Sequence, residues 1–292
     1  MPVTLAAWSW RTPLGAGPDA LARVLAGHTA LTTPPASLAP YGVARVATIA
    51  REPAASPHAR YLHRIALLGM EAAVEALGSW SGDRDRLGVF TALGGLRAVW
   101  GDLDVAMAGQ RPDGAAPWAN GLGKVHPHWM LRHLSNNAHA LLAITLGARG
   151  EGTTTSGPVG GATALAAAIR ALEAGTLDAA LVMACDTLLQ PEVLLEGAVA
   201  GRWADGGPGE AAVAVVLERG EGPAIRVETG VGGGEMGMDR VTAAFGDVGA
   251  ATALAQLVVL AGGGRGSGHG SGVAESGGPP GLWARIHLGE AA

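Results

Sequence analysis

Short apolar runs and longer segments with helical spacing alternate along the chain. Residues 3–8, 87–92 and 179–184 are apolar runs of strand length, whereas residues 63–77 place apolar side chains three and four positions apart, as in an amphipathic helix. The other predicted strands are residues 43–49, 153–156, 211–218, 225–229 and 283–288. The other predicted helices are residues 19–26, 102–108, 128–145, 162–174 and 251–261. This alternation predicts α/β layers rather than a helical bundle or a β-sandwich.

Glycine-rich segments separate several of these elements. The sequence RGEG at 219–222 joins strands 211–218 and 225–229, which predicts that the two strands pair. Residues 262–278 are of low complexity and predict a flexible loop. Too little chain follows this loop to form a second domain, so we expect one domain over residues 1–292.

Composition excludes several classes of protein. Of 292 residues, 48% are apolar and 15% are charged, which excludes an intrinsically disordered chain. The net charge of −5 argues against nucleic acid as a partner. The one cysteine, Cys185, excludes an intramolecular disulfide and a thiolate metal cluster. No apolar run reaches the roughly 18 residues of a membrane span, and no basic segment precedes the first apolar run. We therefore expect a soluble, cytoplasmic protein without a membrane partner.

Neither the glycine spacing nor the histidines predict a cofactor or a metal. A G-x-G-x-x-G pattern occurs at 232–237, but 47 glycines make roughly one such match expected by chance, and no βαβ unit follows it. His126, His128, His133 and His139 are separated by two, five and six positions, which turns successive rings away from one another on a helix. We predict surface or interface histidines.

Residues 150–178 carry the most information about chemistry. A hydroxyl-rich strand, a glycine turn and an alanine-rich helix form a strand–elbow–helix unit, which can present a nucleophile at a helix N-terminus. With Arg149-Gly150 before the strand, the glycine pair Gly160-Gly161 after the elbow, and Gly175 and Asp178 before the next strand, this unit resembles the β-ketoacyl synthase family. The plainer alternative is an ordinary α/β elbow without family meaning.

The resemblance extends over residues 1–220. Further matching segments are Trp10-Arg11-Thr12-Pro13-Leu14-Gly15, Leu25-Ala26-Gly27, Leu87-Gly88-Val89-Phe90 with Gly94-Gly95, and Asn136 with Ile144, Gly147 and Gly150. It implies the thiolase-like fold with α-β-α-β-α layers, here with a reduced C-terminal half at 221–292.

The chain departs from the family at the positions that carry catalysis. Pro158 stands where the family has its acyl-accepting cysteine, and Cys185 lies a whole helix downstream. The family's first histidine motif has no counterpart. Its second resembles residues 246–251, with Asp247 in place of the histidine. Condensation needs a thiolate and hydrogen-bond donors for the enolate. The resemblance therefore implies a subunit without catalytic residues.

The main hypothesis is a chain-length-factor-type subunit that forms a heterodimer with an active β-ketoacyl synthase in polyketide or fatty-acyl assembly. By resemblance, the strand with Thr153, Thr154, Thr155 and Ser156 is a dimer edge. Apolar residues near the start of helix 128–145 would line an acyl tunnel: Trp129, Met130, Leu131 and Leu134. An acyl carrier protein is a further possible partner.

Two alternatives remain from the sequence. The first is an acyltransferase-type enzyme of the same fold with Ser156, Thr155 or Cys185 as nucleophile, and Asp247 or His139 as base. The second is a docking or scaffold protein that binds an acyl carrier through surface arginines such as Arg97 and Arg132.

Overall fold

A computed structural model describes residues 1–94, 122–203, 206–231, 240–263, 272–278 and 282–289. The predicted helix at 102–108, the glycine pattern at 232–237 and Arg97 lie outside these residues. None of the described helices is long and apolar enough to cross a membrane.

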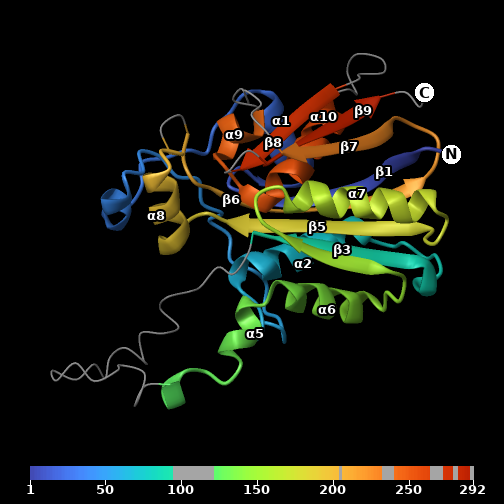
Figure 1. Ribbon diagram of the computed structural model, residues 1–292, viewed down its shortest axis with the longest axis horizontal. Coiled ribbons are helices and arrows are strands. Elements are labelled where there is room, and N and C mark those ends of the chain that lie inside the picture. Colours follow the sequence, from blue (N-terminus) through green and yellow to red (C-terminus); the bar gives the residue numbers. More distant parts are fainter. Residues whose placement is uncertain (95–121, 204–205, 232–239, 264–271, 279–281, 290–292) are drawn as a thin grey trace.

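A six-stranded sheet forms the larger part of the fold (Figure 1). Its strands are β1 (Val3–Thr12), β2 (Gly15–Ala16), β3 (Leu87–Leu93), β4 (Gly152–Ser156), β5 (Ala179–Thr187) and β6 (Glu210–Arg219), in the spatial order β2-β1-β6-β5-β3-β4. β3 runs parallel to β4 and β5, whereas β6 is antiparallel to β1 and β5. β5 and β6 are almost continuously apolar and buried, as expected of central strands covered on both faces.

Helices and a second sheet complete the layers. α2 (Arg64–Leu77) and α6 (Ser135–Leu146) pack on one face of the large sheet. On the other face, α7 (Gly160–Glu173) and α10 (Thr252–Gly263) separate it from a three-stranded sheet. That sheet has the order β7-β9-β8, formed by β7 (Ala224–Val231), β8 (Gly272–Gly278) and β9 (Leu282–Gly289). The α/β layering predicted from the sequence is confirmed.

Short helices connect these layers. They are α1 (Gly17–Leu25), α5 (Trp129–His133), α8 (Pro191–Val199) and α9 (Arg240–Phe245), with the 3-10 turns η1 (Ala36–Tyr41), η2 (Arg84–Arg86), η3 (Leu122–Lys124) and η4 (Gly249–Ala251). α8 and α9 were not predicted.

The alternation of β5 divides the core into two. Val182 and Ala184 face α7 and α10, whereas Met183 and Cys185 face α2. Because side chains on a strand point alternately to opposite faces, this one strand contributes to both apolar clusters.

One predicted strand pairing and one predicted strand are wrong. β6 and β7 do not pair with each other, because β6 lies between β1 and β5 and β7 pairs with β9 in the other sheet. The connecting turn includes Gly222 at φ 138°, a conformation that redirects the chain out of the plane of the large sheet. Residues 43–49 form only isolated bridges, Thr32 to Val46 and Ala47 to Gly209, rather than a strand.

Two predicted boundaries are also wrong. The predicted helix 128–145 is interrupted at Leu134, whose ψ of 120° is extended, so α5 and α6 are separate helices. The predicted flexible loop 262–278 is in part regular, because Gly262 and Gly263 end α10 and residues 272–278 form β8 along β9. Backbone pairing with β9 orders a segment whose side chains have little strand preference.

The central helix layer should dominate stability. Leu165 of α7 is fully buried in the cluster between the two sheets, so Leu165→Ala should lower the free energy of unfolding by about 2–5 kcal/mol. Val199 of α8 is 84% exposed, and Val199→Ala should change the free energy of unfolding by less than about 0.5 kcal/mol. Urea unfolding of both variants measures the difference, and equal losses would contradict the assignment of the core.

Candidate functional site

The elbow between β4 and α7 is a tight turn centred on Pro158. The Gly160 amide donates to the Gly157 carbonyl at 3.0 Å, and Val159 has φ −98° and ψ 12°. These are the features of a type I turn with proline at its second position, the position that proline favours. Pro158 has no nucleophilic atom. The residue at the tip of the elbow therefore fixes the turn and cannot accept an acyl group.

The threonine hydroxyls at the elbow form hydrogen bonds that hold the backbone in place. The Thr155 hydroxyl lies 2.8 Å from the Gly160 carbonyl and 3.2 Å from the Thr91 carbonyl. Thr91, fully buried on β3, donates from its hydroxyl to that of Thr154 at 3.1 Å. These contacts hold β4 and the elbow to β3. They leave Thr155 in a structural role rather than in that of a nucleophile.

A buried carboxylate lies where the ends of the strands meet. Asp186, at the end of β5, is 1% exposed and accepts from the Thr187 amide at 2.9 Å and the Ala250 amide at 3.1 Å. Ala250 belongs to η4, so this side chain connects the large sheet to the C-terminal half of the chain.

Glycines allow this close approach. A Cβ at Gly94 would lie 1.8 Å from Asp186 Oδ2, and a Cβ at Gly249 would lie 2.1 Å from the same atom. A Cβ at Gly161 would lie 2.3 Å from the Ala250 carbonyl oxygen. We call this region the strand-end junction; it comprises Gly94, Asp186, Gly157–Gly161 and η4. It is packed, and a carboxylate occupies its centre.

Asp247 is engaged in structure. Its carboxylate pairs with Arg202 and accepts from the Gly249 amide at 2.9 Å. Its backbone bonds to Gly207 and Gly209, which fixes the turn before η4. An aspartate bound in this way holds η4 in place.

Cys185 lies on the opposite face of the sheet from the elbow. It is 1% exposed and packs against Gly69 of α2, where a Cβ would lie 3.2 Å from the thiol Sγ. Burial, and secondarily the Asp186 carboxylate, raise the pKa of the thiol. The thiolate needed for nucleophilic attack is therefore disfavoured.

Ser156 and His139 lie at opposite ends of β4. His139 is beside Gly152 at the start of the strand, with its Cε1 3.0 Å from the position of a Gly152 Cβ. Ser156 ends the strand, and four residues of strand span about 13 Å. Burial lowers the pKa of His139. The two side chains are therefore not brought together as nucleophile and base.

The predicted tunnel residues are on or near the surface. α5 extends beyond the large sheet next to α6 (Figure 1). Met130, Leu131 and Leu134 are exposed, whereas Trp129 is half-buried with its ring centroid 4.6 Å from that of His133.

The histidines of this region form pairs that the spacing did not predict. His133 is buried, and its Nδ1 lies 2.9 Å from Nε2 of His63 at the start of α2. His126 and His128 have ring centroids 5.4 Å apart. Within the described residues, no group of three or more His, Cys, Asp or Glu side chains could hold a metal ion.

A buried ion pair beside β5 was missed from the sequence. Glu210 begins β6 and accepts from Arg64 of α2 at 2.6 Å. Burial raises the pKa of Glu210, although the Arg64 guanidinium opposes this effect. A small cavity of about 130 Å³ adjoins the pair and is lined also by His63 and Gln190. The two residues are 146 positions apart, and no motif signalled their contact.

Solved structures identify the fold. "The ishigamide ketosynthase/chain length factor" aligns over 99% of both chains with a TM-score of 0.70 and 17% identity. A type II polyketide synthase acyl-carrier protein in complex with its ketosynthase, AntDE:AntF, aligns over 99% of both chains at 0.72 and 13% identity. The chain has the ketosynthase fold.

The third structure extends this agreement. The oxazolomycin ketosynthase domain KS7 of OzmH, from Streptomyces albus JA3453, aligns with a TM-score of 0.73 and 12% identity, over all of this chain and 75% of its own. No protein-family model and no curated protein matches the chain. The thiolase-like layers expected from the resemblance are therefore confirmed, and the ketosynthase fold is present with Pro158 at its elbow.

The junction should not tolerate a side chain at Gly249. Gly249 has φ 52° and no space for a Cβ, so Gly249→Ala should lower the free energy of unfolding by about 2–5 kcal/mol from backbone strain and overpacking together. Gly147 has φ 65° with nothing within 4 Å, so Gly147→Ala isolates the backbone cost of about 1–2 kcal/mol. Chemical denaturation of both variants measures the two losses in the free energy of unfolding. Equal losses would show that Asp186 does not fill the junction.

The Glu210 carboxyl should make stability depend on pH. Because its pKa is raised in the folded chain, the fold binds this proton more tightly than the unfolded chain does. Its contribution to stability is therefore present below the ordinary value of 4.5 and is lost as pH rises through the raised pKa. Glu210→Gln should remove this loss, whereas Glu196→Gln on exposed α8 should keep it. Unfolding measured from pH 4 to 8 tests this, and parallel profiles for wild type and Glu210→Gln would contradict it.

Proposed function

We propose that this chain is a non-catalytic, chain-length-factor-type subunit that pairs with an active β-ketoacyl synthase in polyketide or fatty-acyl assembly. The observation that carries the proposal is Pro158 at the elbow of a ketosynthase fold. A proline there cannot hold an acyl chain, and the other candidate nucleophiles are buried or lack a base.

A free sheet edge supports pairing with a second subunit. β4 is the last strand of the large sheet, and its outer edge is unpaired among the described strands. Thr153 and Thr154 are half-exposed, and Ser156 is exposed. Such an edge offers backbone donors and acceptors to a strand of a partner. In this proposal, the unpaired edge of β4 pairs with a strand of the ketosynthase subunit and forms the heterodimer interface.

Apolar side chains flank this edge. Ile144 of α6 is 73% exposed, and Met130, Leu131 and Leu134 are exposed at the junction of α5 and α6. α6 carries apolar residues around most of its circumference, which is typical of a helix buried on more than one side. We call Met130, Leu131, Leu134, Ile144 and strand β4 the β4 surface. In the heterodimer, its α5 residues together with Trp129 would form one wall of the acyl tunnel.

The proposal also covers a carrier protein, the domain organisation and the location of the complex. One solved structure with this fold is described as a complex with an acyl-carrier protein, and we propose a carrier protein as the second partner here. We also propose that residues 1–292 act as one domain and that the complex is cytoplasmic, in keeping with the composition.

A charge on the β4 surface should prevent heterodimer formation. Ile144→Glu would place an uncompensated carboxylate in the interface and should weaken association with an active β-ketoacyl synthase co-expressed with this chain at least tenfold. Val199→Glu, on equally exposed α8 away from β4, is the matched control and should leave the heterodimer intact. Size-exclusion chromatography with light scattering measures the assembly.

Three outcomes would contradict the proposal. The wild-type chain would elute as a monomer beside a ketosynthase that is fully active alone. Val199→Glu would disrupt the complex while Ile144→Glu does not. Intact-mass analysis would detect a stable acyl adduct on this chain, lost on Ser156→Ala, after incubation with acyl thioesters.

A further inference from the structure

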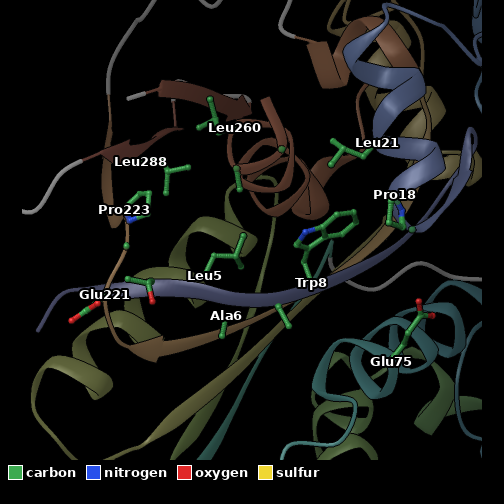
Figure 2. Close-up of a pocket in the computed structure, with 16 residues that line it drawn as sticks. Leu5, Ala6, Trp8, Pro18, Leu21, Glu75, Glu221, Pro223, Leu260 and Leu288 are labelled. Carbon is green, nitrogen blue, oxygen red and sulfur yellow. The ribbon is translucent and has the colours of Figure 1, made fainter. Parts of the chain in front are cut away.

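A large groove lies along β1, at the opposite side of the large sheet from β4 (Figure 2). Its volume is about 720 Å³, within the range of ligand-binding clefts. Leu5 and Trp8 line it from β1, Leu21 from α1, Leu260 from α10 and Leu288 from β9. We call this the β1 groove. It is remote from the strand-end junction and from the β4 surface, so neither role described above explains it.

The strand that borders the groove has an unpaired edge. β2 pairs only with Arg11 and Thr12, so among the described strands residues 3–10 pair with β6 alone. Natural sheets protect such edges with charged residues or proline. Residues 3–10 (VTLAAWSW) contain neither. This edge therefore keeps free backbone donors and acceptors beside an apolar surface.

One uncompensated carboxylate lies at the end of the groove. Glu221 is exposed near Thr4, and no cation in the described part of the chain pairs with it. Glu75, about half exposed, lies below β1, but its charge is balanced by Arg11 at 2.6 Å. The charge of Glu221 favours a basic ligand over a fatty acid or an acidic carrier helix.

We propose that the β1 groove binds an extended peptide segment of a partner protein, which adds to β1 as a strand. Alternate apolar side chains of the segment would enter the groove between β1 and the residues of α1, α10 and β9, while a lysine or arginine pairs with Glu221. The free strand edge favours a peptide over a small molecule, because a peptide backbone satisfies a row of donors and acceptors at once. A second copy of this chain with the same groove seated on it would bring a second Glu221 close to the first.

Designed peptides on the full chain test the proposal. The probe is a fluorescein-labelled peptide, KVTVTVTK, in which valines share one face and lysines lie at both ends. We expect measurable binding by fluorescence anisotropy, with EVTVTVTE at least fivefold weaker. Two N-methylated versions of the peptide are methylated on the two alternate sets of backbone amides. In an added strand, the methyl groups of one version face β1 and those of the other face solvent. We expect one version to lose at least tenfold in affinity and the other to retain it.

Matched variants locate the site. Glu221→Lys should weaken KVTVTVTK two- to fivefold, the size of one exposed ion pair, and should strengthen EVTVTVTE. Glu196→Lys makes the same charge change on exposed α8 and should leave both affinities unchanged. Ala6→Arg, at the exposed bulge of β1, should weaken KVTVTVTK without affecting the fold.

Four results would overturn the proposal. KVTVTVTK would fail to bind at millimolar concentration. Both N-methylated versions would bind equally, so that no strand is added. Glu221→Lys and Glu196→Lys would have the same effect. The chain alone would self-associate in competition with the peptide, which would assign the groove to a second copy. None of these depends on pairing with a ketosynthase, so each can fail or succeed separately from the proposed function.

Discussion

The contact between the Asp186 carboxylate and the amide of Ala250 is the constraint on which the arrangement of the two halves depends. The carboxylate is buried, and a buried charge is tolerated only where hydrogen-bond donors satisfy it. The donors come from β5 itself and from η4, and glycine at 94 and 249 makes room for them. β5 and η4 therefore meet at a buried polar contact, and Gly161 of α7 lies close to the Ala250 carbonyl oxygen beside it.

This constraint does not involve the residue at the tip of the elbow. Pro158 contributes its ring conformation to a type I turn, and the turn is closed by Gly157 and Gly160. Asp247 anchors the turn before η4 through Arg202. The resemblance places Pro158 and Asp247 at the family's catalytic positions, and in this structure both residues stabilise local backbone.

The sequence predicted elements well where packing and local pattern agree. The continuous apolar run of β5 and the helical spacing of α2 were both recognisable because burial dictates each pattern. The strand partners could not be recognised, because β6 and β7 are consecutive strands joined by a short turn, and the sequence does not show that α7 and α10 lie between their sheets. At the site, the resemblance drew attention to Pro158 and Asp247, and their assignment to the family's catalytic positions stays a prediction. Motif spacing did not signal every contact. It did not signal the pairs Arg64–Glu210 and His63–His133, since they join residues 146 and 70 positions apart.

The large sheet ends in two free edges of different character, and this difference argues for two different partners. The β4 edge is hydroxyl-rich and is flanked by exposed apolar side chains of α5 and α6, which suits a broad subunit interface. The β1 edge borders an apolar groove with a carboxylate at its end, which suits an extended peptide strand. Because β1 and β4 are separated by three central strands, both edges can be occupied at once. If both proposals hold, the chain would bind a ketosynthase at the β4 edge and a basic peptide segment at the β1 edge.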